Sequence, residues 1–275
     1  MKPPRPANSP IDKARRRTWL SALAGYLVPV DAAAIEAWLR QFAPEHRDLA
    51  ARVLDAILFI PQGEMAARLR DGLQALPGWS DDPAARAGKW RFAALSSSAG
   101  ESGDAMLHLL RRAAGLSPAK NSSLFIYRSD IPQERFTSQD TLVFVDDFSG
   151  TGDQAVRAWQ RSIVELLPTE PRLFLVLVAA NDQAISRIQT ETPLTVVAGT
   201  SLHPSANVFS PQCHHFEQME KQILLGYCNV ADHNHPQGYG DCGNLIAFPH
   251  GVPNNSIPIL RAANKRWVPL LRRPA

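Results

Sequence analysis

Between residues 90 and 199, short apolar runs alternate with amphipathic segments, and no other feature of the sequence restricts the fold as strongly. The apolar runs cover 90–95, 123–127, 141–145, 172–180 and 194–199. The segments between them that have helical spacing are 104–114, 153–167 and 183–190. Nearly continuous apolar runs are typical of parallel strands that helices cover on both faces. The alternation therefore predicts an α/β fold with a doubly wound, mostly parallel sheet.

The remaining sequence predicts further parts on either side of this core. The first ten residues contain four prolines and little to bury, which indicates a mobile N-terminus. After Asp31, a typical N-cap residue, the apolar side chains recur at helical spacing: Ile35, Trp38, Leu39 and Phe42. The tail is rich in His, Asn, Gly and Pro. We therefore expect a mobile segment at 1–10, a helical unit at 11–80, the α/β core at 88–200 and a loop-rich C-terminal cap at 201–275.

Composition excludes several classes of protein. A net charge of +3 with 20% charged residues is not typical of a dedicated nucleic-acid binder. The N-terminus has no apolar segment after its basic residues, and no apolar run approaches 18 residues, which argues against a signal peptide or a membrane span. Three cysteines cannot all pair within one chain. We therefore expect a cytoplasmic protein with free thiols.

The segment TLVFVDDFSGTGDQAVRAWQ, residues 141–160, carries the strongest chemical signal. An apolar run ends in Asp146 and Asp147, a turn with two glycines follows, and a helix is expected from Asp153. Parallel sheets bind ligands at the carboxyl ends of their strands. Glycine lets backbone amides converge there, and a helix N-terminus favours an anion. Because paired carboxylates repel a bare anion, they suit hydroxyl donors or a metal ion that the ligand carries. The segment therefore predicts a sugar-phosphate site.

Two further features are expected at the same edge of the sheet. The loop SSSAGESG, residues 96–103, follows the first apolar run and is rich in Ser and Gly, as an anion-binding loop requires. An ordinary strand-to-helix loop is the alternative. Arg128 follows the second run and could meet an anion or form a surface ion pair. The candidate residues for contact with an anionic ligand here are Ser97, Ser98, Ala99, Gly100 and Arg128.

The C-terminal part holds weaker candidates. Asn254 and Asn255 could read the edge of a base with their amides, or could simply form a turn. His203 lies just beyond the last predicted strand and could act as a general base or be structural. A group of Cys and His residues between 213 and 242 lacks a Cys-x-x-Cys pair. For that group a zinc site is the alternative to buried thiols and solvated histidines.

Residues 145–152, Val-Asp-Asp-Phe-Ser-Gly-Thr-Gly, resemble the ligand-binding signature of type I phosphoribosyltransferases. The resemblance implies that Asp146 and Asp147 contact the ribose hydroxyls of phosphoribosyl pyrophosphate (PRPP). It implies that the following loop holds the 5′-phosphate, through Phe148, Ser149, Gly150, Thr151, Gly152, Asp153 and Gln154. The family's Mg²⁺ bridges pyrophosphate and ribose, so we expect a magnesium ion carried by the ligand and no metal bound by the protein alone.

A longer resemblance covers nearly the whole chain. WLRQF at 38–42, FVDDFSGTG at 144–152 and PNNSIPIL at 253–260 are similar to the phosphoribosyltransferase-like (PRTase-CE) proteins of bacterial conflict systems, including retron and other anti-phage loci. It implies an effector that acts on nucleotides or at the anomeric carbon of ribose. It also implies a partner protein or nucleic acid that restrains the effector.

The sequence departs from the transferase pattern at three places. Gln154 stands where the family has a small hydroxyl residue, which leaves the backbone donors of the phosphate loop intact. The 96–103 loop, which lies where the resemblance implies pyrophosphate binding through Ser97, Ser98, Ala99, Gly100 and Arg128, has no Lys or Arg. The segment 128–140, where transferases carry a catalytic loop, is short. The last two departures favour a non-catalytic nucleotide sensor or scaffold, whereas the intact acid pair favours an enzyme. A plain nucleic-acid binder is a third possibility, and its affinity would fall steeply with salt. Turnover therefore stays open at this point.

Overall fold

A computed structural model describes residues 11–96, 102–167 and 171–272. Its contacts divide the chain into two units. One unit is 63–202, and the other combines 1–62 with 203–275. This division differs from the ranges expected from the sequence, which ended the helical unit at residue 80 and made the C-terminal part a separate cap. The two units are described separately below.

The first unit contains a parallel sheet. Its strands are β2 (Trp90–Ala94), β3 (Thr141–Ser149), β4 (Arg172–Asn181), β5 (Thr195–Ala198) and β6 (Ser201–Leu202). The order is β2-β3-β4-β5, with β6 pairing a later part of β4, and every pairing is parallel. Four of the five predicted apolar runs are therefore confirmed as strands, and the fold is α/β.

The fifth predicted strand, 123–127, was wrong. The 3-10 helix η3 (Ala119–Leu124) takes up the start of this run. Only Phe125 pairs with the sheet, in a single parallel bridge to Phe92, and the two rings stack at 5.4 Å. This bridge lies on the edge of β2 opposite β3. After β2 the chain therefore first passes this outer edge and then crosses back to form β3 on the other side of β2. Such a reversal is where open parallel sheets form their ligand crevices.

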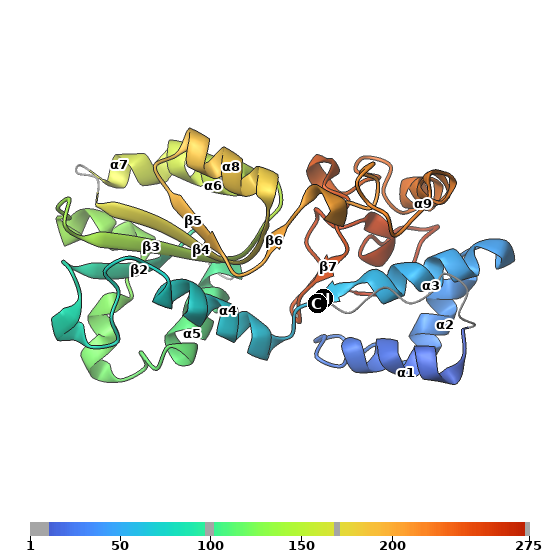
Figure 1. The fold of residues 1–275 in the computed structure, drawn as a ribbon, viewed down its shortest axis with the longest axis horizontal. Helices are drawn as coiled ribbons and strands as arrows, with labels where there is room; N and C mark the ends of the chain where they lie inside the picture. Colours follow the sequence, from blue (N-terminus) through green and yellow to red (C-terminus); the bar gives the residue numbers. More distant parts are fainter. Residues whose placement is uncertain (1–10, 97–101, 168–170, 273–275) are drawn as a thin grey trace. The chain divides into compact units, whose positions relative to one another are not determined.

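Helices cover both faces of the sheet (Figure 1). On one face lie α4 (Gln62–Gln74) and α5 (Ser102–Ala113); on the other lie α6 (Asp153–Ala158), a π-helical turn (Trp159–Ile163), α7 (Val164–Leu166) and α8 (Asp182–Glu191). A Cβ on Gly72 would lie 2.9 Å from Cγ1 of Val176, so α4 packs closely on β4. This contact explains why the residues after 62 group with the sheet. No helix in the described ranges has both the length and the apolar character needed to cross a membrane.

The second unit is mainly helical and has its own core. Its elements are α1 (Lys13–Ala22), α2 (Ala32–Arg40), α3 (Arg47–Ala56), β1 (Leu58–Phe59), α9 (Gln218–Ala231) and β7 (Ile246–Ala247). The strands β1 and β7 pair in parallel. Asp31 caps α2 as predicted, since its side chain accepts a hydrogen bond from the Ala34 N–H at 2.7 Å.

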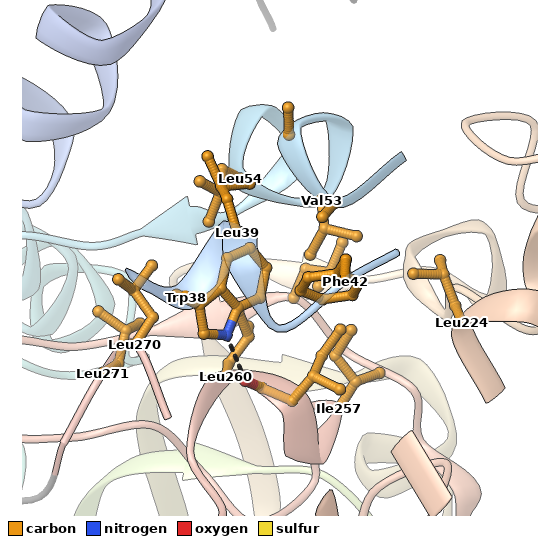
Figure 2. Packing of buried hydrophobic residues seen from close by; sticks show 14 of the residues in the cluster. Trp38, Leu39, Phe42, Val53, Leu54, Leu224, Ile257, Leu260, Leu270 and Leu271 are labelled. Carbon is orange, nitrogen blue, oxygen red and sulfur yellow. Dashed lines mark hydrogen bonds between the residues drawn. The ribbon is translucent and has the colours of Figure 1, made fainter. Parts of the chain in front are cut away.

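The C-terminal residues complete the core of this helical unit. Figure 2 shows Trp38 and Phe42 of the α2 region packed among side chains of the C-terminal part, including Leu260 and Leu271. The indole Nε1 of Trp38 donates to the carbonyl of Ile259 at 2.9 Å. Burial of these large side chains is the main stabilising term, so residues 203–272 belong to one hydrophobic core with the N-terminal helices.

The two units also contain short 3-10 helices. These are η1 (Pro44–His46), η2 (Pro83–Ala85), η4 (Arg128–Glu134), η6 (Pro204–Ala206), η7 (Tyr239–Asp241) and η8 (Pro258–Leu260).

Candidate functional site

The two acids lie inside β3 rather than after it, because the strand runs on to Ser149. Asp146 is 2% exposed, and Asp147 is half-buried. One carboxyl oxygen of Asp146, Oδ1, accepts hydrogen bonds from the Ser102 hydroxyl at 2.7 Å and from the Asp147 N–H at 2.9 Å. Ser102 is the first residue of α5. The beginning of α5 is therefore fixed to the carboxyl end of β3.

Burial raises the pKa of Asp146 from 3.8 to about 8, and the neighbouring charge of Asp147 adds to the rise. The hydrogen bonds from Ser102 and from the Asp147 backbone lower this pKa, but by less than burial raises it. A side-chain hydrogen bond between the two acids also raises it. Two adjacent carboxyl groups with little access to water cannot both ionise readily. Asp146 therefore keeps its proton to a much higher pH than an exposed aspartate does.

The loop after β3 offers backbone donors. In the described part of the chain, no acceptor pairs with the N–H groups of Gly150, Thr151 or Gly152, whereas the carbonyl of Gly150 accepts from the side chain of Asn181 at 3.1 Å. Gly152 has a φ of +81°, and a Cβ there would lie 3.2 Å from the carbonyl of Ala184. Only glycine suits such a position without strain. Successive N–H groups without acceptors, at the start of a helix, are an arrangement that binds anions.

Charged side chains surround this loop. Asp153, the first residue of α6, forms an ion pair with Arg187 of α8, with 2.5 Å between Oδ1 and Nη1. The same guanidinium donates to the carbonyl of Thr151 at 3.3 Å and to Glu191 at 2.8 Å. Arg157 lies 3.9 Å from Asp153. Hydrogen bonds to Glu191 and Asp153 raise the pKa of Arg187. The acidic start of α6 is therefore paired with cations.

Arg128 reaches the end of β2. Its Nη1 donates to the carbonyl of Leu95 at 2.7 Å, and its Nη2 donates to the hydroxyl of Ser162 in the π-helical turn. The N–H of Leu95 donates to the carbonyl of Val145 at 3.4 Å, which places Arg128 next to the strand that carries the acids. Burial lowers the pKa of Arg128, and no carboxylate forms an ion pair with it among the described residues. A half-buried cation of this kind is suited to an anionic partner.

The other predicted site residues have different surroundings. Ser97, Ser98, Ala99 and Gly100 lie outside the described residues. Phe148 and Ser149 are half-buried in β3, and Gln154 is exposed on α6. The pyrophosphate role of the 97–100 loop therefore stays a prediction.

His203, Asn254 and Asn255 belong to the helical unit rather than to the sheet unit. Asn255 is buried, and its amide nitrogen donates to the carbonyl of Tyr239 at 2.9 Å and to the sulfur of Cys242 at 3.4 Å. That amide is thus engaged in holding its own loop, whereas Asn254 and His203 are exposed. Base binding and general-base catalysis by these residues stay predictions.

Sequence reasoning missed several residues that build the site. Asn181 is the last residue of β4, at the carboxyl end of the strand, so the rule that singled out the acids applies to it as well. Ser102 lies in the 96–103 loop but was not among the candidate ligand-binding residues. Arg187 gave no signal of its own, because its spacing from Glu191 is that of an ordinary helical ion pair.

The cysteines and histidines of the C-terminal part do not form a metal centre within the described ranges, where no three His, Cys, Asp or Glu side chains are grouped to hold an ion. Cys213, Cys228 and Cys242 are free and buried. Burial raises the pKa of Cys228 to about 12, so this thiol stays protonated. The prediction of buried thiols is confirmed.

Comparison with known families gives one match. A family model described as PRTase-CE matches residues 35–273, which is nearly the whole chain and includes β3 and the loop after it. No curated protein matches the sequence.

Proposed function

The chain belongs to the PRTase-CE family, and from this membership and the geometry at the end of β3 we propose that it binds a phosphoribosyl ligand, either PRPP or a nucleotide. The observation that carries the proposal is the pairing of an anion loop with an acid pair. Three N–H groups at 150–152 have no acceptor in the described structure, and they follow directly on β3, which carries Asp146 and Asp147. A 5′-phosphate suits the N–H groups, and a vicinal diol suits the acids.

The acid pair divides into two chemically different groups in this proposal. Asp147 is half-buried and offers a carboxylate that accepts a hydrogen bond from a ribose hydroxyl. Asp146 is buried and holds a proton near neutral pH. Its Oδ1 accepts the hydrogen bond from Ser102, which links the strand to α5. The oxygen donors present fit a hard cation such as a ligand-carried Mg²⁺. When bound, such an ion would offset negative charge between the ligand's phosphates and the acids.

Arg128 supports a second anionic group on the ligand. Its guanidinium carries a charge that no carboxylate neutralises within the described residues, and it contacts the end of β2, the strand next to β3. Two of its five N–H donors are used by Leu95 and Ser162, which leaves donors for an anion. We propose that Arg128 meets the pyrophosphate of PRPP or the corresponding group of a nucleotide.

Isothermal titration calorimetry with ribose-5-phosphate, Mg²⁺ being present, tests the binding proposal. We expect ribose-5-phosphate to bind and ribose to give no measurable heat, because the loop requires the anion. Asp147→Asn should weaken binding at least tenfold. The matched control is Asp71→Asn, an exposed acid on α4 that forms an ion pair with its neighbour Arg70. Absence of binding by the wild-type protein, or equal binding by Asp147→Asn, would contradict the proposal.

We propose further that the protein acts on nucleotides or at the anomeric carbon of ribose as an effector in bacterial anti-phage defence. The intact acid pair and the family resemblance support this role, and a partner protein or nucleic acid would restrain the activity. The lack of Lys or Arg in the 96–103 loop and the shortness of the 128–140 segment favour a second candidate, a nucleotide sensor or scaffold without turnover.

Expression in cells separates the two candidates. An effector should be toxic and should deplete a nucleotide pool, and the double substitution Asp146→Asn/Asp147→Asn should remove both effects. If wild type and double variant are equally harmless and metabolite profiles are unchanged, the effector role fails and the sensor role remains.

A further inference from the structure

We infer that Arg187 of α8 is a positioning residue that makes the loop after β3 able to hold a phosphate, because it neutralises Asp153 and fixes Thr151. The inference rests on the proposed phosphoribosyl binding and concerns how this chain achieves it. No sequence motif predicts a cation on α8, and the evidence for the role of Arg187 is its contacts with Asp153 and Thr151.

Asp153 poses an electrostatic problem for an anion site. It follows directly on Gly152, and its side chain is only 22% exposed, so water screens its charge incompletely. Its carboxyl group lies within ion-pair distance of Arg187 and Arg157. A phosphate bound to the N–H groups of residues 150–152 would therefore lie close to a like charge, which would weaken its binding.

Arg187 offsets the negative charge of Asp153 and also contacts the loop, both through one guanidinium. Nη1 pairs with Asp153 Oδ1 and also donates to the carbonyl of Thr151, the central residue of the loop. Nε donates to Glu191 at 2.8 Å, so the guanidinium is held from its other side as well. The backbone of α8 lies close to the loop, since a Cβ on Gly152 would meet the carbonyl of Ala184. The cation is therefore placed by the packing of α8 on the loop.

A plain surface ion pair is the alternative explanation, and such pairs contribute little to stability. Arg157 provides the comparison within the same site, because its Nη2 approaches Asp153 only to 3.9 Å, its side chain is 58% exposed, and among the described residues it makes no hydrogen bond to the loop backbone. If Arg187 were only a surface pair, its removal would resemble the removal of Arg157. If it prepares the anion site, the two variants differ in ligand affinity.

The test measures the affinity for ribose-5-phosphate with Mg²⁺ in four variants beside the wild type. Arg187→Gln should bind about tenfold more weakly, an order of magnitude that one uncompensated charge a few ångströms from the phosphate produces. Asp153→Asn should bind severalfold more tightly than wild type, because a like charge is gone while the cations remain. The double variant Arg187→Gln/Asp153→Asn should recover most of the lost affinity. Arg157→Gln should lose at most about twofold.

Two further readouts distinguish charge compensation from a general loss of structure. The deficit of Arg187→Gln should shrink as salt rises from 0.05 to about 0.5 M, because screening weakens the repulsion. Its thermal unfolding temperature should stay close to that of the wild type. Failure of Asp153→Asn to rescue, or a deficit independent of salt, overturns the inference while wild-type binding keeps the proposed function intact. Absence of wild-type binding instead overturns the proposed function.

Discussion

Replacing Asp146 by Asn should stabilise the protein at alkaline pH while it impairs the site. The pKa of Asp146 is raised from 3.8 to about 8, first by burial and then by the charge of Asp147. Between these two pH values the folded state holds a proton that the unfolded state has lost. The free energy of unfolding therefore falls as pH rises through this window, and it levels off above pH 8.

The size of the effect follows from the shift. Each unit of pKa corresponds to about 1.4 kcal/mol, so a shift of roughly four units sets a ceiling of about 6 kcal/mol. Because part of the shift comes from the charge of Asp147 and the site can relax, we expect the free energy of unfolding to fall by about 2–3 kcal/mol between pH 5 and pH 9. For a unit of this size, such a loss of unfolding free energy lowers the melting temperature by several degrees. Asparagine has the same shape, still accepts the Ser102 hydrogen bond and has no proton to lose.

Thermal unfolding at pH 5, 7 and 9 provides the assay. The wild-type melting temperature should fall across this series beyond the change seen for Asp146→Asn, which should be the more stable protein at pH 9. Asp71→Asn, an exposed acid on α4, serves as control and should follow the wild type. Equal pH dependence of wild type and Asp146→Asn, or a less stable variant at pH 9, would refute the reasoning.

Three other substitutions test separate parts of the account. Burial alone raises the pKa of Asp140, but hydrogen bonds from neighbouring N–H and hydroxyl groups outweigh it and lower this pKa. Asp140→Asn should cost about 1–3 kcal/mol at pH 7, and this deficit should shrink as pH falls below 4 and through the lowered pKa of Asp140. A deficit that does not shrink at all between pH 7 and pH 3 would count against this. Gly152→Ala, at φ +81°, should cost about 1–2 kcal/mol in denaturant unfolding and abolish ribose-5-phosphate binding, so unchanged calorimetry would count against the loop geometry. Trp38→Phe should cost about 1–2 kcal/mol in the same unfolding assay, because the Ile259 carbonyl loses the hydrogen bond from the Trp38 indole and keeps only the one from Trp267. A neutral substitution would contradict the packing in Figure 2.

The sequence was sufficient to predict the sheet where a strand is apolar on both faces. Runs such as 141–145 and 172–180 are typical of the interior of a covered parallel sheet, and both are strands. The run 123–127 looks similar but is not buried throughout, since Tyr127 is 79% exposed. Composition alone does not distinguish such a run from a strand, because tertiary contacts decide how much of it pairs.

Long-range packing explains what could not be predicted. The sequence gives no sign that α4 packs on β4, or that the C-terminal residues share a core with α2, because amphipathic spacing shows which face is buried and not against which partner. For the site, the acid pair and the glycine loop were predictable, since their chemistry is contiguous in sequence. Ser102 and Arg187 lie 44 and 34 residues from their partners Asp146 and Asp153, and only the fold brings them together.

Amide NMR spectroscopy during a titration with ribose-5-phosphate and Mg²⁺ tests the central claim most directly. If the backbone after β3 holds the 5′-phosphate, the amide resonances of Gly150, Thr151 and Gly152 should shift strongly downfield and saturate together with the Asp147 amide. If these resonances do not move at ligand concentrations that saturate binding measured by calorimetry, the phosphate binds elsewhere and the account is contradicted.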